Sequence, residues 1–411
     1  MRRNKSFESD REPFRDHDSL ELQKSRVTGP FSALHPTEAR YHINAPPDSA
    51  GLESQSKPPS NVAFKWRSRD NRKGRHTLVV RPSDPSSQYQ APPPTSSIGR
   101  IMRTIGRMFF YYPVWDISWW VAYIFTWGSI IWVINAFFSL LPFTTPSTTF
   151  PTEVLYGGGI TAFIGATVFE IGSVLLMLEA INENRSSCFG WAVESLFEAP
   201  STEKAATSAS LTLRPAKDKC LHHHANKKNF VGKPQPNAVA SATSKSASAA
   251  GRSWTWWPST HDLRTHYFHD IGFIACFSQL LGASIFWIAG FTALPGINNN
   301  LSPAALNGAY WFPQVLGGCG FIVSGFLFML ETQKRWYLPA CGVLGWHIGL
   351  WNLIGGVGFT ICPCFGFDTA HWAQYQASTS TFWGSWAFLI GSAVQLYESL
   401  EKNPVEVDKS A

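Results

Sequence analysis

Residues 117–141 read ISWWVAYIFTWGSIIWVINAFFSLL and contain no charged side chain. A helix of about 20 apolar residues crosses a bilayer core about 30 Å thick, so this segment is long enough to span a membrane. Five further blocks of similar composition follow it, at 156–178, 271–294, 309–330, 342–362 and 379–397. The sequence therefore predicts an all-α membrane protein with six transmembrane helices.

The first hundred residues have a different composition. They hold 17 of the 34 Lys and Arg residues and contain no long apolar run. Such a segment buries too little apolar surface to offset the entropy lost on folding, so we expect residues 1–100 to be a disordered basic cytoplasmic tail. Its densest charge, at 65–75, is expected either to be solvated or to contact anionic lipid headgroups. No nucleic-acid partner is expected for a chain with six spans.

A second low-complexity segment separates the second and third predicted helices. Residues 183–262 include a run rich in Ser, Ala and Lys, which is typical of a flexible linker. The three predicted hairpins then occupy 101–182, 263–333 and 334–400, and residues 401–411 form a short C-terminal tail.

The distribution of basic residues predicts the orientation. The connections at 142–155, 295–308 and 363–378 contain no Lys or Arg, whereas Arg100, Arg103 and Arg107 precede the first helix. Because Lys and Arg accumulate in cytoplasmic segments, both termini and the linker are predicted to be cytoplasmic, in either the plasma membrane or an internal membrane. The sequon Asn300-Leu301-Ser302 then lies on the opposite side, where Asn300 is a candidate for glycosylation.

The even-numbered helices end on a shared pattern. The Ile-Gly-Ser sequence at 171–173 precedes Glu179 by the same spacing that separates the Ile-Gly-Ser at 390–392 from Glu398, and the fourth helix ends on Glu331 in the same register. We therefore predict three hairpins that are parallel repeats, a design known from transporters and equally suited to a structural scaffold.

The sixth helix also carries a family resemblance. Its sequence WGSWAFLIGS at 383–392, followed by Glu398, resembles the small membrane domain called YrhK-like. The hydrophobic part as a whole is similar to fungal integral membrane proteins. This resemblance implies a two-helix membrane hairpin and assigns no activity.

Two polar residues within the predicted helices are candidate functional sites. Glu170 is an acid inside an apolar block, and such acids either serve function at a cavity or bond to a neighbouring helix in their protonated form. Asn352 lies on a stripe of small residues with Gly342, Gly345, Gly349 and Gly356, where an interhelical hydrogen bond is favoured over a ligand contact. A transport path is predicted to be lined by Glu170 together with Asn135, Gln279, Asn352 and Gln395.

Three acids at the predicted cytoplasmic helix ends form a candidate acidic belt. Glu179, Glu331 and Glu398 oppose the helix dipole at those positions, so basic partners are expected in a structural ion-pair belt, with a binding ring as the alternative. The His222-His223-His224 run adjoins Cys220 in the predicted linker without a fixed geometry, so neither a metal site nor a cofactor is predicted.

Three functions remain open from the residues alone. No nucleotide-binding or hydrolase motif is present, so catalytic residues are not expected. The favoured hypothesis is a non-enzymatic scaffold or sensor that contacts the bilayer and other membrane proteins. The alternatives are a small-solute or proton-coupled transporter or channel and, third, a membrane redox protein.

Overall fold

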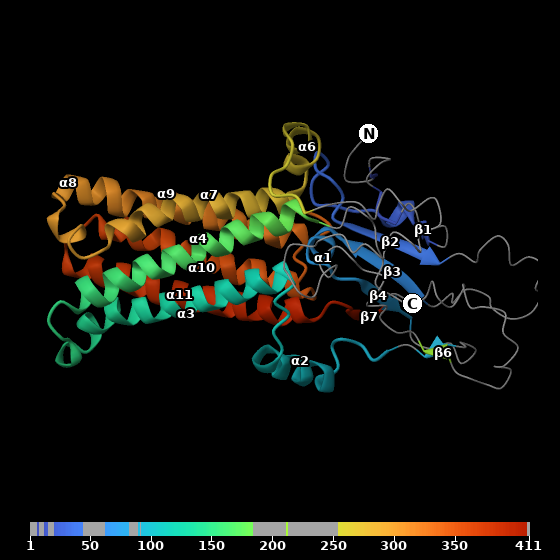
Figure 1. Cartoon of the computed structure of the whole chain (residues 1–411), viewed down its shortest axis with the longest axis horizontal. Coiled ribbons are helices and arrows are strands. Elements are labelled where there is room, and N and C mark those ends of the chain that lie inside the picture. The colour runs from blue at the N-terminus through green and yellow to red at the C-terminus, as the bar shows by residue number, and fades with distance from the viewer. Residues whose placement is uncertain are drawn as a thin grey trace, which may run out of the picture. The chain divides into compact units, whose positions relative to one another are not determined.

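The computed structural model describes two compact units of the chain (Figure 1). The described residues are 6–7, 12–14, 20–43, 62–81, 89–90, 92–183, 211–212 and 254–408. The first unit draws them from 1–116, 182–256 and 400–411, and the second from 117–181 and 257–399. Most of the predicted linker, including the triple-His run, lies outside the described residues.

The first unit is built on a five-stranded sheet with the order β1-β2-β3-β4-β7 (Figure 1). The strands are β1 (Leu20–Leu22), β2 (Glu38–Ile43), β3 (Val62–Arg67), β4 (Thr77–Val80) and β7 (Val405–Val407). Strands β1 to β4 pair in antiparallel fashion. Strand β7 adds to β4 in parallel, with Leu78 opposite Val405, so the C-terminal segment completes a sheet begun near the N-terminus.

Successive side chains of each strand point to alternate faces of this sheet. Tyr41 of β2 is opposite Phe64 of β3, and both are buried. With Leu78 and Val405 they belong to an apolar core on one face. The intervening side chains, among them Lys65, point to the other face, as the two-residue period of a strand requires. The second face of the sheet is therefore the charged one.

This sheet corrects three predictions from the sequence. The chain is not all-α, because it contains this sheet. Four segments within residues 1–100 form the strands β1 to β4, so they are not a disordered tail. Residues 401–411 include the paired strand β7. The run 65–75 is divided between β3 and the short helix α1 (Ser68–Arg72). Arg67, Arg69 and Lys73 are buried there, so these three side chains are not solvated, and a contact of this run with lipid headgroups stays a prediction.

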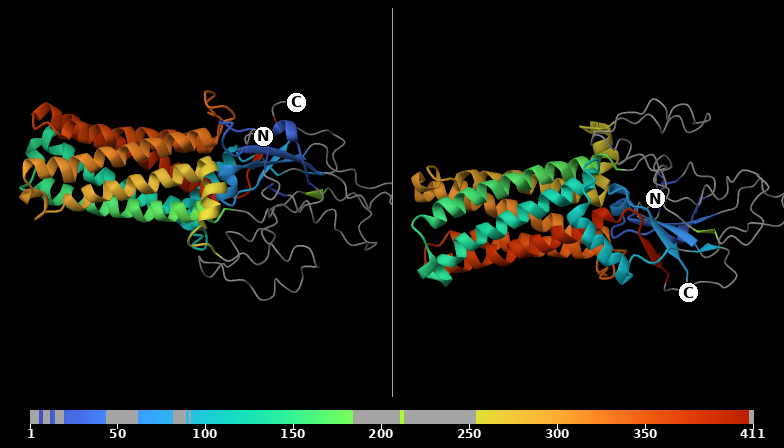
Figure 2. Two further views of the ribbon diagram at one scale, coloured as in Figure 1. Left: turned by 90° about the horizontal axis from the view of Figure 1, so that it is seen from above. Right: turned by 60° about the horizontal axis from the view of Figure 1, so that its bottom comes forward.

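The second unit contains six long helical segments, seen along their length in Figure 2. Five are long and apolar enough to cross a membrane: Ile117–Thr144, Glu153–Ile181, Ile271–Thr292, Pro303–Glu331 and Leu344–Gly366. The sixth, α11 (His371–Leu400), is longer than each of them but richer in Ser, Thr and Gln. The outer faces of the first four carry exposed large apolar side chains such as Trp127, Ile171 and Leu281.

Those spans correspond to named elements, with shorter ones between them. The long helices are α3 (Ile117–Thr144), α4 (Gly159–Ile181), α7 (Ile271–Thr292), α9 (Phe312–Glu331), α10 (Leu344–Gly366) and α11. The π-helical segments η5 (Glu153–Gly158) and η8 (Asn307–Trp311) extend α4 and α9 at their N-termini. The others are η2 (Lys24–Arg26), β5 (Tyr89–Gln90), α2 (Ile98–Phe110), η4 (Pro146–Thr148), β6 (Leu211–Thr212), α6 (Thr260–Thr265), η6 (Tyr267–His269), η7 (Asn298–Asn300) and α8 (Pro303–Leu306).

The six helices form a closed ring in chain order. Helix α3 packs on α4, α4 on α7, α7 on α9, and α9 on α10. Gly358 of α10 meets Gly384 of α11, where an added Cβ would lie 2.8 Å from the neighbouring Cα. Ser392 of α11 donates a hydrogen bond to Ser129 of α3 at 3.3 Å, which closes the ring.

Glycines allow α9 and α10 to approach each other closely. A Cβ on Gly349 would lie 2.6 Å from the backbone nitrogen of Met329, and one on Gly356 would lie 2.9 Å from that of Ile322. Both belong to the stripe of small residues that the sequence predicts as a packing face, and small residues let helix backbones approach in this way. The stripe is thus confirmed as a packing face at these two positions.

Candidate ligand cavity

A cluster of six aromatic side chains fills the centre of the ring. Each helix contributes one buried member, and we call this cluster the aromatic plug: Trp132, Phe169, Phe286, Phe321, Phe359 and Phe388. The rings touch at centroid distances of 4.9 to 6.4 Å, mostly edge to face. The void among them measures about 10 Å³, the space of about one water molecule.

A cavity of about 380 Å³ begins at this plug and extends to one end of the bundle. Trp132, Phe286 and Phe359 form its floor, and all six helices contribute to its wall. It is partly open and reaches Asn298 in the segment that joins α7 to α8. Its volume lies within the range of small-molecule sites, about 300 to 1,000 Å³. No Asp, Glu, Lys, Arg or His is among its lining residues.

Both π-helical segments line this cavity. Val154 and Leu155 come from η5, and Tyr310 and Trp311 come from η8. Thr152, which precedes η5, adopts a φ of +65°, a conformation that a β-branched residue rarely takes. Segments of π-helix are rare and are frequent at functional sites, so their placement at this one cavity marks it as the candidate site.

Four amide side chains at the cavity have the same hydrogen-bond arrangement. The amide nitrogen of Asn135 donates to the Gly158 carbonyl at 2.7 Å, and that of Gln314 donates to the Tyr310 carbonyl at 3.1 Å. Gln374 and Asn298 likewise donate to backbone carbonyls. Because a carbonyl only accepts, the nitrogen of each amide must face it. The amide oxygens of Asn135, Asn298 and Gln374 point away from these carbonyls and can act as acceptors, whereas the Gln314 side chain is also hydrogen-bonded to Tyr310.

Of the four residues predicted to line a path with Glu170, only Asn135 borders the cavity. Glu170 itself is half-buried between α4 and α7, where it accepts a hydrogen bond from Ser284 at 2.8 Å. It therefore belongs to a packed interface between helices. Asn352 donates within its own helix to the Ile348 carbonyl at 2.8 Å, and its interhelical hydrogen bond stays a prediction.

The three acids of the predicted belt are all buried. Glu179, Glu331 and Glu398 keep at most 2% of their surface exposed. Glu179 accepts a hydrogen bond from Ser118 of α3 at 2.5 Å. They lie at the helix ends opposite the cavity, which separates them from the candidate site. Their pairing in an ion-pair belt stays a prediction.

Two further expectations concern the surface and metals. Asn300 is exposed in η7, and its side-chain amide donates to the Gly296 carbonyl at 2.8 Å. In the part of the chain that the structure describes, no group of three or more His, Cys, Asp or Glu side chains is arranged to hold a metal ion.

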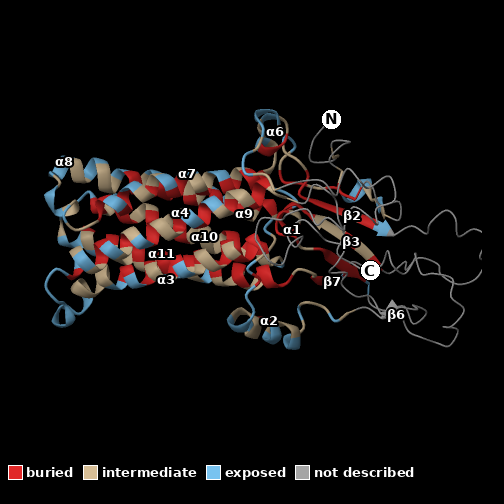
Figure 3. Ribbon diagram, in the orientation of Figure 1, coloured by how far each residue is buried: buried red, intermediate tan, exposed pale blue. Residues whose placement is uncertain are grey.

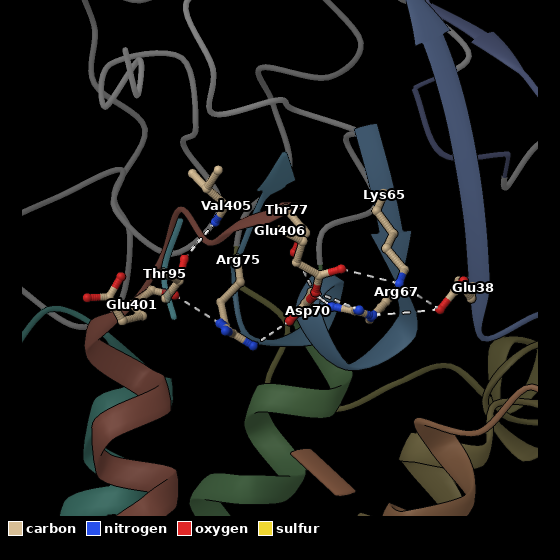
Figure 4. Close-up of polar contacts among 10 residues, drawn as sticks. All are labelled: Glu38, Lys65, Arg67, Asp70, Arg75, Thr77, Thr95, Glu401, Val405 and Glu406. Atoms are coloured by element: carbon tan, nitrogen blue, oxygen red, sulfur yellow. Dashed lines mark hydrogen bonds and ion pairs between the residues drawn. The ribbon is translucent and has the colours of Figure 1, made fainter. Parts of the chain in front are cut away.

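A second polar cluster lies on the charged face of the sheet, and sequence reasoning did not identify it. Figure 4 shows Arg67 between two strands, with Glu406 of β7 at 2.7 Å and Asp70 at 3.4 Å. Lys65 lies 3.2 Å from Glu38 and 3.4 Å from Glu406. Basic residues of β3 are thus matched by acids from β2, α1 and β7.

These contacts shift the pKa of Glu406. Burial alone would raise its pKa, but the charges of Arg67 and Lys65 outweigh that effect and lower it to about 2. The pKa of Lys65 falls because of burial and the charge of Arg67, although Glu38 and Glu406 oppose this change. Every charged member of the cluster has an oppositely charged partner, and these ion pairs join β7 to the sheet.

In comparisons with protein-family models, with curated proteins and with solved structures, nothing matches the chain. The candidate site is therefore assigned from its own geometry and chemistry.

Proposed function

We propose that this chain is a six-span membrane protein whose helical ring binds an uncharged small molecule bearing hydrogen-bond donors, and that it works as a non-enzymatic sensor. The observation that carries the proposal is the cavity of about 380 Å³, walled by all six helices, lined without charges and closed at its floor by aromatic rings.

The sheet supports six crossings rather than five. Strands β4 and β7 are hydrogen-bonded neighbours, and two strands of one sheet must lie on the same side of a membrane because irregular backbone and sheet edges are not tolerated in lipid. An even number of crossings must therefore separate residue 80 from residue 405. Five helices qualify by length and composition, and α11 supplies the sixth. The polar side chains of α11 can be tolerated in a membrane-spanning helix because α11 packs against α3 and α10.

The aromatic plug supports the proposed threefold repeat. Phe169, Phe321 and Phe388 each precede the terminal acid of their own helix by ten positions, and all three meet at the centre of the ring. Trp132, Phe286 and Phe359 supply the corresponding ring from the first helix of each hairpin. The same placement of one aromatic residue in each helix of a hairpin therefore occurs three times about an axis along the bundle. It accounts for both sets of three rings in the plug.

The wall of the cavity indicates the chemistry of the ligand. Its amide oxygens accept hydrogen bonds, and its Trp, Tyr and Phe rings offer flat apolar surface. Charged ligands would lose hydration without gaining a counter-charge. A neutral compound with several hydroxyl or N–H donors and an apolar face matches both features. This is the ligand class that we propose.

The plug favours sensing over conduction. A channel needs a continuous polar path, whereas five of the six rings, with Ala166 and Ala283, line a void of only about 10 Å³. A proton-coupled transporter would use an acid at its site, and Glu170 is not among the lining residues. By the positive-inside rule, the cavity faces the non-cytoplasmic side, because the three connections at that end have no Lys or Arg.

The topology is tested by glycosylation reporters placed in the chain one at a time. Reporters at positions 145, 303 and 370 should be modified in cells, and one at position 230 should not. The result follows from six crossings with cytoplasmic termini, since all three connections of the cavity end then share the glycosylated side. Modification at 145 and 303 without modification at 370 would remove α11 as a span and overturn the six-span proposal.

Binding is tested through Cys362, which lines the cavity. N-ethylmaleimide should alkylate Cys362 of the purified full-length protein about tenfold faster than Cys276, which is also buried but lies outside the cavity. A panel of uncharged hydroxyl-bearing compounds is then screened for saturable protection of Cys362, measured by mass spectrometry. Replacing Gln314 by Leu should weaken that protection about tenfold, the value of about one hydrogen bond.

The matched control for Gln314→Leu is Gln279→Leu, because Gln279 is equally buried but does not line the cavity. It should leave protection unchanged. If Cys362 reacts no faster than Cys276, the cavity is inaccessible. If charged compounds protect Cys362 as well as neutral ones do, the proposed ligand class is wrong.

A further inference from the structure

Helix α2 presents an apolar face to its surroundings, although it belongs to the sheet unit and is not a span. Ile98, Met102, Ile105 and Phe109 recur at steps of four, three and four residues, which places them on one side of the helix. They are 39 to 80% exposed, and Phe110 beside them is 87% exposed (Figure 3). No described part of the chain covers this face.

The polar side of α2 is fixed in place. Arg100 forms an ion pair with Glu401 at 2.9 Å and donates to the Asn403 carbonyl at 2.7 Å. The hydroxyl of Thr104 also donates to Glu401. In turn, the Glu401 carbonyl accepts a hydrogen bond from Arg75, as Figure 4 shows. Since these contacts hold one side of α2 against its own unit, the apolar side is directed outward.

Two of the three basic residues of α2 have no carboxylate partner among the described residues. Arg103 is exposed, and the Arg107 guanidinium lies over the Tyr111 ring at 4.7 Å. At 3.6 residues per turn, both lie on the polar side of the helix and away from the apolar stripe. A helix with one apolar face and Arg residues on the other is typical of binding in the interface of an anionic membrane.

We propose that α2 is an interfacial helix, which inserts its apolar face among the acyl chains of an anionic lipid leaflet while Arg103 and Arg107 contact the headgroups. Its 13 residues are about 20 Å long, too short to cross a bilayer core of about 30 Å.

The covalent chain favours a lipid occupant over a soluble partner. Only residues 111–116 separate α2 from α3, so the end of α2 lies within about 25 Å of the start of the first span. Tyr111, Tyr112 and Trp115 fall in this connection, and Tyr and Trp concentrate at membrane interfaces. Because the apolar face of α2 is held this close to a bilayer, we expect the bilayer itself to cover it.

A photo-crosslinking experiment on the full-length protein tests the proposal. A benzophenone amino acid replaces Met102 in one variant and Arg103 in another, and each protein is reconstituted in vesicles of equal phosphatidylcholine and phosphatidylserine. These neighbours lie on opposite sides of the helix. We expect about tenfold more lipid adduct at position 102 than at position 103, measured by mass spectrometry.

The lipid preference is tested in the same vesicles. The double variant Arg103→Gln, Arg107→Gln, with the probe at position 102, should lose an enrichment of phosphatidylserine over phosphatidylcholine adducts of about fivefold or more. Crosslinks from position 102 to a second copy of the chain would instead make this face a dimer interface. Equal lipid adducts at positions 102 and 103 would show that α2 does not lie in the interface. Either result overturns the proposal.

Discussion

Replacing Arg67 by Met should lower the free energy of unfolding of the sheet unit by about 3 kcal/mol, because removal of one partner from a buried ion pair leaves the other charge without compensation. Arg67 lies between Glu38, Asp70 and Glu406. The Glu38 and Asp70 side chains are 12% and 4% exposed, while Glu406 keeps 36% and is therefore partly screened. Hydrogen exchange of peptides from β3 and β7, measured in the full-length protein, reports the loss.

Arg81→Gln is the control for this variant. Arg81 is also near an acid of the same sheet, but its side chain is 53% exposed and 4.0 Å from Asp408. Its loss should change the free energy by less than about 0.5 kcal/mol. If exchange in β7 is the same in Arg67→Met as in the unchanged protein, the cluster does not hold the C-terminal strand.

The pH dependence of exchange gives a second measure of the same cluster. In the folded state the pKa of Glu406 is about 2, and its ordinary value is 4.5. The unfolded chain therefore binds more protons between these values, and the stabilisation is complete above about pH 4.5 and is lost as the pH falls toward 2. Arg67→Met should reduce this dependence, since it removes the largest opposing charge.

Replacing Gly349 by Leu should destabilise the helical ring by about 3 kcal/mol. A Cβ at this position would meet the Met329 backbone at 2.6 Å and the Met329 side chain at 2.8 Å. The backbone cannot yield without separating α9 from α10, and overpacking of this kind costs about 1 to 3 kcal/mol or more. Thermal unfolding of the purified protein in detergent should show the loss as a lower midpoint.

Gly342→Leu is the matched control, because Gly342 belongs to the same predicted stripe but has nothing within 4 Å of an added Cβ. It should leave the midpoint unchanged. A lower midpoint in both variants would mean that the leucine side chain itself, and not close helix approach at Gly349, is responsible.

Much of the helical part follows from the sequence, because spans are long and their signal accumulates over many residues. The predicted block at 271–294 corresponds to α7 at Ile271–Thr292, and that at 342–362 to α10 at Leu344–Gly366. The prediction for residues 379–397 misses the start of α11, since His371 to Ser378 are polar and resemble a loop.

The sheet was missed for a physical reason. Its strands are three to six residues long and widely spaced, and its last strand comes from the opposite end of the chain. A signal was present: residues 38–43 and 64–67 alternate apolar with charged or polar side chains. The charges at 65–75 looked unpaired because their partners, above all Glu406, are distant in sequence.

The cavity could not be predicted from periodicity. Its wall combines residues from six helices, and its π-helical segments have no sequence pattern that distinguishes them from ordinary helix. Glu170 was singled out because acids are costly in lipid, but it lies between α4 and α7, where it accepts a hydrogen bond from Ser284, and does not line the cavity. Asn135 was identified, whereas Gln314 and Gln374 were not, since their positions near helix ends gave no reason to select them.

The pairing of β4 with β7 has a consequence for biosynthesis. In the proposed six-span topology, a ribosome makes β4 before the first span and β7 after the last one, so β4 keeps an open edge while the helices enter the membrane. That edge is filled only when α11 has been inserted in the proposed direction, because the opposite direction would leave Val405–Val407 on the other side of the membrane. On this topology, a truncated or misinserted chain would keep the edge of β4 unpaired.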